Sequence, residues 1–124
     1  MKYLLDTNIF IWFIHGDSDL PPKYRKIIEN SENEIFISQV SIWEIAIKVS
    51  LGKLKLNIPF NDLIPGELNE NGFSIFPINN EHIRRVIELP FHHRDPFDRL
   101  IYAQSLVEGY EFCYTDKIFD EYQN

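Results

Sequence analysis

Four carboxylates in this sequence follow predicted strands or stand in the first turns of predicted helices. They are Asp6, Glu44, Asp98 and Asp116. In an open parallel sheet, the carboxyl ends of the strands and the amino ends of the following helices share one edge. We therefore expect the four side chains to meet, although they are far apart in the chain. Carboxylates gathered in a partly buried place repel one another and raise one another's pKa, which a divalent cation would relieve.

The chemistry that such a cluster would support is hydrolysis of a phosphodiester bond. Ligand sets made only of oxygen select hard cations, so Mg²⁺ or Mn²⁺ is expected, and no cysteine and histidine spacing favours zinc. A Mg²⁺ ion held by carboxylates keeps several waters and also binds phosphate oxygens. It can activate a water and stabilise charge on the attacking and leaving oxygens. One ion or two would both fit this pattern.

Each acid also has a purely structural explanation. Glu44 stands three residues after a serine and could close a capping box. Asp95 precedes a proline and is a candidate N-cap, while Asp98 could stabilise the same helix through its dipole. Asp116 could be a turn residue. Asp6 has the weakest structural explanation, and the common edge of all four acids favours the metal site.

The elements that must position these acids alternate along the chain. Strands are expected over residues 2–5, 35–37, 73–78 and 112–114. Helices are expected over 8–14, from Pro21-Pro22, from Ser38 or Ser41 to Gly52, from Asn79 or Asn80 to Leu89, and from Asp95 to Gly109. Residues 53–58 alternate like an extended edge, residues 60–70 are weakly helical and interrupted at Pro65-Gly66, and residues 117–122 form a short turn. Strands separated by helices predict a three-layer α/β/α sandwich with a mostly parallel central sheet of four or five strands.

Length and composition limit the class of protein. The 124 residues, 44% of them hydrophobic, suit a single domain over residues 1–124. The net charge of −7 argues against broad electrostatic binding of nucleic acid. One cysteine, Cys113, cannot form an intramolecular disulfide and suggests a reducing compartment. Because no uncharged run is long enough to span a bilayer and no signal peptide is apparent, we expect a cytoplasmic protein without membrane contact.

Four sequence blocks carry a resemblance to a known family. They read LLDTN over 4–8, SIWEIAIK over 41–48, HRDPFDRLIYAQ over 93–104 and YTD over 114–116. Together these blocks resemble the PIN domain, in particular the VapC-type toxins of bacterial toxin–antitoxin pairs. The first block alone is unspecific, but the four occur in order over nearly the whole chain.

The resemblance implies a Mg²⁺- or Mn²⁺-dependent endoribonuclease that acts on RNA and is often a homodimer. It also implies a cognate antitoxin protein, through which alone the toxin would contact DNA. By position, Asp6, Glu44 and Asp98 match the family's metal ligands, and Asp116 matches its fourth acid. Asn8 and Thr115 match supporting polar residues, and Asp95 is assigned to capping and support of the acids. The family usually has a further short strand after the block that contains Asp116, and this chain ends at Asn124 without one.

Cations and tryptophans near the acidic blocks are the remaining candidates. Lys48, Arg94 and Arg99 are the expected RNA contacts, because they lie nearest the acids in sequence. Trp12 and Trp43 are expected to pack or to contact a partner rather than to stack on bases.

Two alternatives to the nuclease stay open. The first is a catalytically silent PIN-fold binding module, against which the presence of all four acids speaks. The second is a receiver-type signalling domain, which would need a phosphoacceptor aspartate at the end of the third strand. The sequence there is Phe76-Pro77-Ile78-Asn79, without an acid.

Overall fold

The fold is built on a parallel sheet with helices on both faces. The computed structural model describes residues 1–92 and 95–123. Its strands are β1 (Lys2–Leu5), β2 (Glu34–Ser38), β3 (Ser74–Phe76) and β4 (Glu111–Cys113), in the order β3-β2-β1-β4. Every pair of neighbouring strands is parallel, and Tyr3 of β1 is in register with Ile35 and with Glu111.

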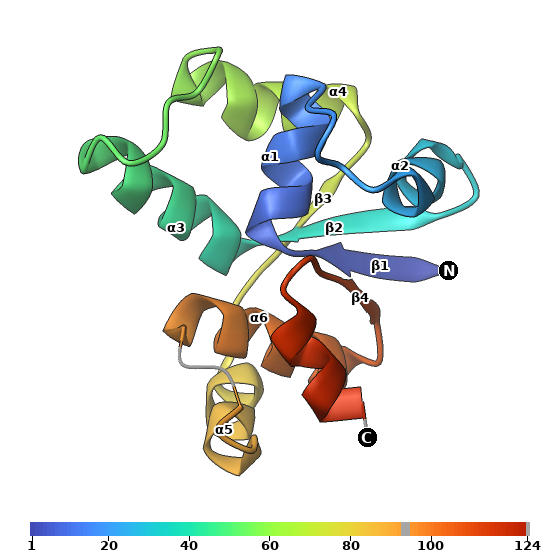
Figure 1. The fold of residues 1–124 in the computed structure, drawn as a ribbon, viewed down its shortest axis with the longest axis vertical. Coiled ribbons are helices and arrows are strands. Elements are labelled where there is room, and N and C mark those ends of the chain that lie inside the picture. Colours follow the sequence, from blue (N-terminus) through green and yellow to red (C-terminus); the bar gives the residue numbers. More distant parts are fainter. Residues whose placement is uncertain (93–94, 124) are drawn as a thin grey trace.

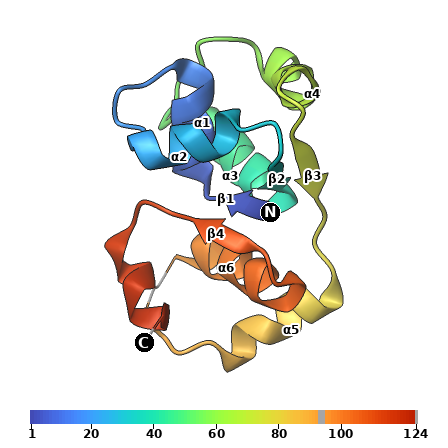
Figure 2. The same cartoon turned by 90° about the vertical axis from the view of Figure 1, so that its right-hand side faces the viewer.

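The helices form the two outer layers. They are α1 (Thr7–His15), α2 (Pro22–Glu29), α3 (Gln39–Ser50), α4 (Leu68–Glu70), α5 (Asn80–Glu88) and α6 (Pro96–Glu108), with a π-helical turn over Asp62–Glu67 and a 3₁₀ helix over Lys117–Gln123. The first four helices lie on one side of the sheet, and α5, α6 and the 3₁₀ helix lie on the other (Figures 1 and 2). The predicted three-layer sandwich is therefore confirmed. Among the described helices, none is both long and apolar enough to cross a membrane.

Alternating side chains of β1 hold the layers together. Leu5 packs in the cluster that contains Ile9 and Phe10 of α1, whereas Leu4 packs in the cluster that contains Ile101 of α6. Successive residues of a strand point to opposite faces, so adjacent leucines reach opposite layers. Both leucines are fully buried, and each such burial contributes about 2 kcal/mol to the free energy of unfolding.

Polar side chains start the helices at the carboxyl edge of the sheet. Asp6 follows β1 and accepts a hydrogen bond from the Ile9 amide at 2.8 Å, so it caps α1. Ser38 ends β2 and caps α3 through the Val40 amide at 3.0 Å. These caps join each strand to its helix by a single residue, which fixes where the first helical turns lie relative to the sheet.

Two expectations about local structure are corrected. Residues 53–58 belong to no strand. Their apolar pattern arises because Leu54, Leu56 and Ile58 pack on the core cluster beneath α1 and α3 while the backbone runs as a loop. Ser41 lies inside α3 rather than at its start, so no capping box joins it to Glu44.

Two other expectations hold. The helical stretch after residue 60 is interrupted as expected, since Ile64 has φ −124° and ψ 110°. The sheet has four strands, at the lower end of the predicted range, and the described residues after β4 form the 3₁₀ helix rather than a fifth strand.

Candidate functional site

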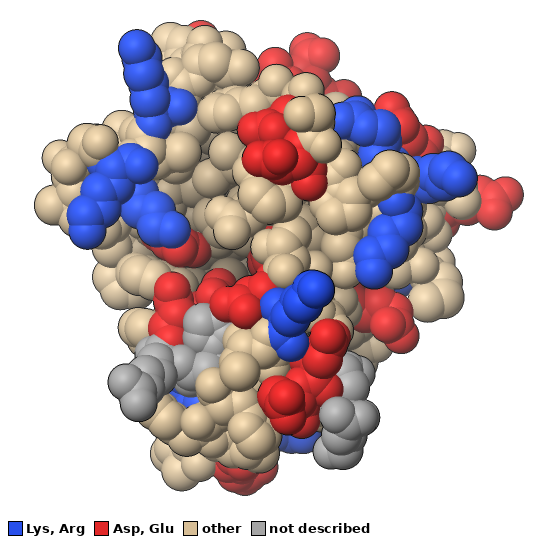
Figure 3. All heavy atoms as spheres, viewed as in Figure 1, with Lys and Arg blue, Asp and Glu red and all other residues tan. Residues whose placement is uncertain are grey.

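The carboxyl edge of the sheet carries a pocket of about 110 Å³ lined by the predicted acids. Asp6, Glu44, Asp98 and Asp116 all border it. Asp95, Asn8, Thr115, Thr7 and Lys48 complete the lining. The surface shows acidic side chains in a hollow between the regions of α3 and α6, with basic side chains to either side (Figure 3). The structure thus brings together the four carboxylates that the strand-end rule places at one edge.

Asp6 is the most deeply anchored of these acids. One carboxylate oxygen accepts from the Ile9 amide, and the other accepts from the Thr115 amide at 3.0 Å and lies 3.4 Å from the Thr115 hydroxyl. Burial raises the pKa of Asp6 from 3.8 to about 6, although these hydrogen bonds act in the opposite direction. The nearby carboxylate of Glu44 raises the pKa further. The hydrogen bonds fix the orientation of the carboxylate, while its surroundings disfavour its negative charge.

Glu44 reaches the pocket from α3, and both of its oxygens are bonded. The Thr7 hydroxyl donates to one oxygen at 2.6 Å, and the Lys48 ammonium lies 2.8 Å from the other. The Ser41 and Thr7 hydroxyl oxygens are 2.9 Å apart. Although burial lowers the pKa of Lys48, the hydrogen bond and charge of Glu44 raise it above its usual value. Lys48 is therefore the cation that offsets negative charge on this side of the pocket.

Asp98 has a pKa that rises further above its ordinary value than that of Asp6. Its pKa rises from 3.8 to about 7, first because of burial and then because of the charges of Asp95, Glu44, Asp6 and Asp116. Asp95 caps α6 by accepting from the Phe97 amide at 2.8 Å, as its place before Pro96 predicts. Among the described residues that line the pocket, acidic side chains therefore outnumber the basic one, Lys48.

Asp116 occupies the exposed rim of the pocket. Its carboxylate accepts from the Ile118 amide at 3.0 Å, so it also serves as the turn residue that starts the 3₁₀ helix. Asp116 is therefore both a turn residue and one of the acids that line the pocket.

The donor types of the pocket fit a hard divalent cation. All four acids offer oxygen, and the raised pKa values of Asp6 and Asp98 indicate a site where positive charge is favoured. In the described part of the chain, however, no group of three or more His, Cys, Asp or Glu residues is arranged to share a metal ion. Glu44 is held by Thr7 and Lys48 instead, and a shared ion would require the carboxylates to approach one another.

The predicted RNA-contacting cations have different outcomes. Lys48 lies at the acids. The prediction for Arg99 is wrong, because its side chain is buried and donates to the carbonyl oxygens of Val86 and Pro90, both at 3.1 Å. It ties the end of α5 to α6. Arg94 lies outside the described residues.

Two hydroxyls at the site were not predicted from the sequence. Thr7 and Ser41 are both buried and together support Glu44. A signal existed in each case. Thr7 directly follows the N-cap Asp6. Ser41 stands three residues before Glu44, so Ser41 and Glu44 lie on the same face of one helix.

Replacing Thr7 by valine is expected to destabilise the protein by about 2 kcal/mol, because a buried carboxylate loses a donated hydrogen bond while the side-chain shape is kept. Urea unfolding of the metal-free protein measures the change. Ser50→Ala is the matched control, since the Ser50 hydroxyl donates to the Ile47 carbonyl of its own helix at an exposed position. Equal effects of the two substitutions would contradict a special role of Thr7.

Comparisons with known proteins agree with this architecture. The structure of VapBC2 from Rickettsia felis, bound to a DNA fragment from their promoter, has a chain that matches with a TM-score of 0.70 and 19% sequence identity. The match covers 98% of this chain and 92% of that chain, and at this identity it shows the fold. Ribonuclease VapC16 of Mycobacterium tuberculosis is 32% identical over 65 residues. This stretch is 52% of the present chain and 46% of that relative, so the similarity spans about half of either protein.

The family comparison covers nearly the whole chain. The model of the PIN domain matches residues 3–124, which include all four acids and both capping aspartates. The receiver-type alternative is thereby excluded, in keeping with the lack of an acid at the end of β3. The chain belongs to the PIN domain family.

Proposed function

We propose that the protein is a Mg²⁺- or Mn²⁺-dependent endoribonuclease and the toxin of a toxin–antitoxin pair. The observation that carries the proposal is the convergence of Asp6, Glu44, Asp98 and Asp116 on one pocket. The name of the M. tuberculosis relative, a ribonuclease, supports RNA as the substrate. A catalytically silent PIN module is the second candidate, and it has no need of four acids gathered where neighbouring charges raise the pKa values of Asp6 and Asp98.

The residues divide the work of the site. Asp6, Glu44 and Asp98 would hold the ion, and Asp116 would complete the set at the rim. The ion would supply a polarised water and stabilise charge on the phosphate. Thr115 holds Asp6 in a fixed orientation through its amide and hydroxyl, and Asn8 lies at the pocket's exposed margin.

Lys48 has two roles in this proposal. It neutralises Glu44 at 2.8 Å and, being only half-buried, it also faces the solvent from which RNA approaches. A cation beside the acids lowers the repulsion that the RNA phosphates meet.

Partners follow from the same proposal. The R. felis structure contains a VapBC2 complex bound to promoter DNA, which supports a cognate antitoxin for this chain. We propose that this chain meets DNA only through that antitoxin. We extend the proposal to a homodimer and to a cytoplasmic protein, the latter because Cys113 is a free, buried thiol.

The test is incubation of the purified protein with mixed cellular RNA in Mg²⁺, in Mn²⁺ and in EDTA. Cleavage is expected with either ion and none is expected in EDTA. Sequencing of the cut ends then identifies the cleaved position. Intact RNA in all three conditions would leave only the silent binding module.

A further inference from the structure

A second pocket adjoins the acidic one and has no role in the proposed reaction so far. Its volume is about 420 Å³, typical of pockets that hold a small ligand such as a nucleotide. It is lined by Trp12 of α1, Lys23 and Tyr24 of α2, and Tyr114, Thr115 and Lys117 from the segment after β4. We call it the aromatic pocket.

Thr115 joins the two pockets, since it lines both. Its amide and hydroxyl face the Asp6 carboxylate, at 3.0 and 3.4 Å. A strand of RNA whose phosphate lies at the acids would therefore meet the aromatic pocket with its next nucleotide.

The side chains of the aromatic pocket suit an unstacked base with its phosphate. Trp12 is half-buried and, with Tyr114, offers ring surface to the pocket, which differs from the expectation that it only packs or contacts a partner. Tyr24 is buried and its ring centroid lies 4.8 Å from the Lys23 ammonium, so it forms the wall rather than a stacking face. Lys23 and Lys117 are exposed at its margin. Aromatic faces beside cations are the features that single-stranded nucleic acid uses, because every base has a π-face and every nucleotide a phosphate.

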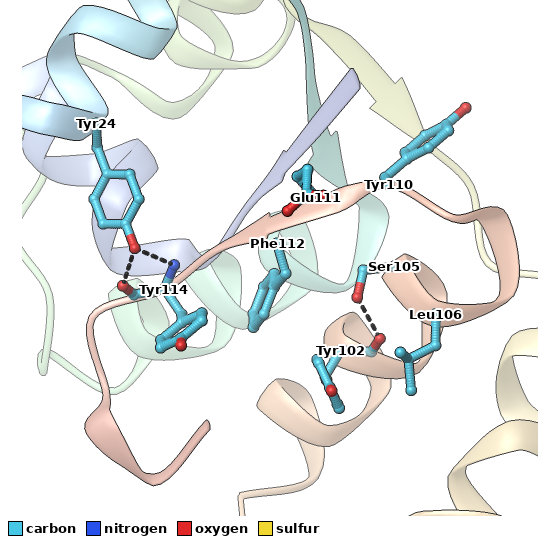
Figure 4. Close-up of a pocket in the computed structure, with 8 residues that line it drawn as sticks. All are labelled: Tyr24, Tyr102, Ser105, Leu106, Tyr110, Glu111, Phe112 and Tyr114. Carbon is cyan, nitrogen blue, oxygen red and sulfur yellow. Dashed lines mark hydrogen bonds between the residues drawn. The ribbon is translucent and has the colours of Figure 1, made fainter. Parts of the chain in front are cut away.

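The wall of the pocket is fixed before any ligand binds. The hydroxyl of buried Tyr24 donates to the Tyr114 carbonyl at 2.9 Å and lies 3.4 Å from the Tyr114 amide (Figure 4). Tyr24 thereby ties α2 to the outer edge of the sheet just beyond β4. A wall held in place by such bonds loses little conformational freedom on binding.

Two acids also border the aromatic pocket, and they bear on its charge. Asp120 accepts a hydrogen bond from the Tyr114 hydroxyl at 2.6 Å, and Asp19 donates its amide to Asp17 at 2.8 Å. The phenol offsets part of the Asp120 charge, and the two lysines balance the two acids in number. This balance contrasts with the acidic pocket and with a net charge of −7 for the chain.

We infer that the aromatic pocket binds the nucleotide next to the cleaved bond in single-stranded RNA. The inference rests on the proposed function and names the place where the substrate is held. Continuity with the acids through Thr115 favours RNA over a protein partner as the occupant.

The test uses a fluorescein-labelled single-stranded oligoribonucleotide in EDTA, where the RNA stays intact. The double variant Lys23→Gln with Lys117→Gln is expected to bind at least about tenfold more weakly, and the slope of log affinity against log salt is expected to become shallower by about 1.4. Lys26→Gln is the matched control, because Lys26 is exposed on α2 outside the pocket, and its affinity stays that of the wild type.

Tryptophan fluorescence gives a second readout. The chain has two tryptophans, so a Trp43→Phe variant leaves Trp12 as the sole reporter. The same RNA without its label is expected to quench Trp12 over the concentrations at which it binds. Unlabelled double-stranded RNA, whose bases stay stacked, is expected to quench it much less.

The outcomes separate the inference from the proposed function. If the wild type cleaves RNA with Mg²⁺ but the lysine variants bind it normally and Trp12 is not quenched, the aromatic pocket is not the RNA subsite and the nuclease stands. If the Lys23→Gln, Lys117→Gln double variant binds RNA normally but no longer binds the cognate antitoxin, the pocket is a protein-docking site. If the wild type neither binds nor cleaves RNA, both the inference and the proposed function are wrong.

Discussion

Asp98→Asn is expected to reduce RNA cleavage by about 10²- to 10³-fold while making the metal-free protein more stable at neutral pH. Asp98 is the acid whose charge is least favoured in the folded state, with a pKa of about 7 set by burial and by four neighbouring carboxylates. Asparagine keeps the shape of the side chain and removes that charge. An aspartate that served only the fold would not carry a charge that destabilises the folded protein. A metal ligand can carry such a charge, because the bound cation offsets it.

Cleavage of cellular RNA in Mg²⁺ and urea unfolding in EDTA measure the two effects. Asp62→Asn is the matched control, because Asp62 is an exposed acid outside the pocket and its replacement leaves both quantities near their wild-type values. Full activity of Asp98→Asn would remove Asp98 from the metal site. Lower stability of the metal-free variant would show that Asp98 serves the fold instead.

The strands and their helices could be predicted because their causes are local. Leu4 and Leu5 belong to a short apolar run that ends at a charged residue, which is the pattern of a buried parallel strand. Asp95 before Pro96 is a cap that the structure reproduces. Strands separated by helices run parallel, so their carboxyl ends share one edge of the sheet, and the four acids meet there.

The remaining features depend on contacts between distant segments. The alternating apolar residues Leu54, Leu56 and Ile58 fit a paired strand and a loop that packs on the core equally well. Only the contacts with the rest of the chain show that this segment is a loop. Arg99 stands one residue after Asp98, yet its guanidinium donates to the carbonyls of Val86 and Pro90 at the end of α5, a contact that no local sequence pattern indicates. The ion pair of Lys48 with Glu44 is local by contrast, since the two residues stand four positions apart in one predicted helix.

The stability of the metal-free protein is expected to fall as the pH rises from about 4 to about 7. The pKa values of Asp6 and Asp98 rise from the ordinary aspartate value of 3.8 to about 6 and about 7 in the folded protein. The folded protein therefore binds these protons more tightly than the unfolded chain. The stability they contribute is complete below about pH 3.8 and is lost as the pH passes through the two folded values. The loss is at most about 1.4 kcal/mol per pH unit for each group, and Asp98 accounts for the larger share because its pKa rises further.

Saturating Mg²⁺ is expected to reverse the slope, because the ion binds the carboxylates only after their protons leave. Urea unfolding at several pH values, in EDTA and in Mg²⁺, gives the two curves. In EDTA, Asp98→Asn should remove the part of the pH dependence of the unfolding free energy that Asp98 contributes. Asp62→Asn should leave the pH dependence unchanged. An unfolding free energy that rises with pH in EDTA would mean that Asp6 and Asp98 are ionised without strain. The acidic pocket would then have no electrostatic need for a cation, and Mg²⁺ would add no stability at higher pH.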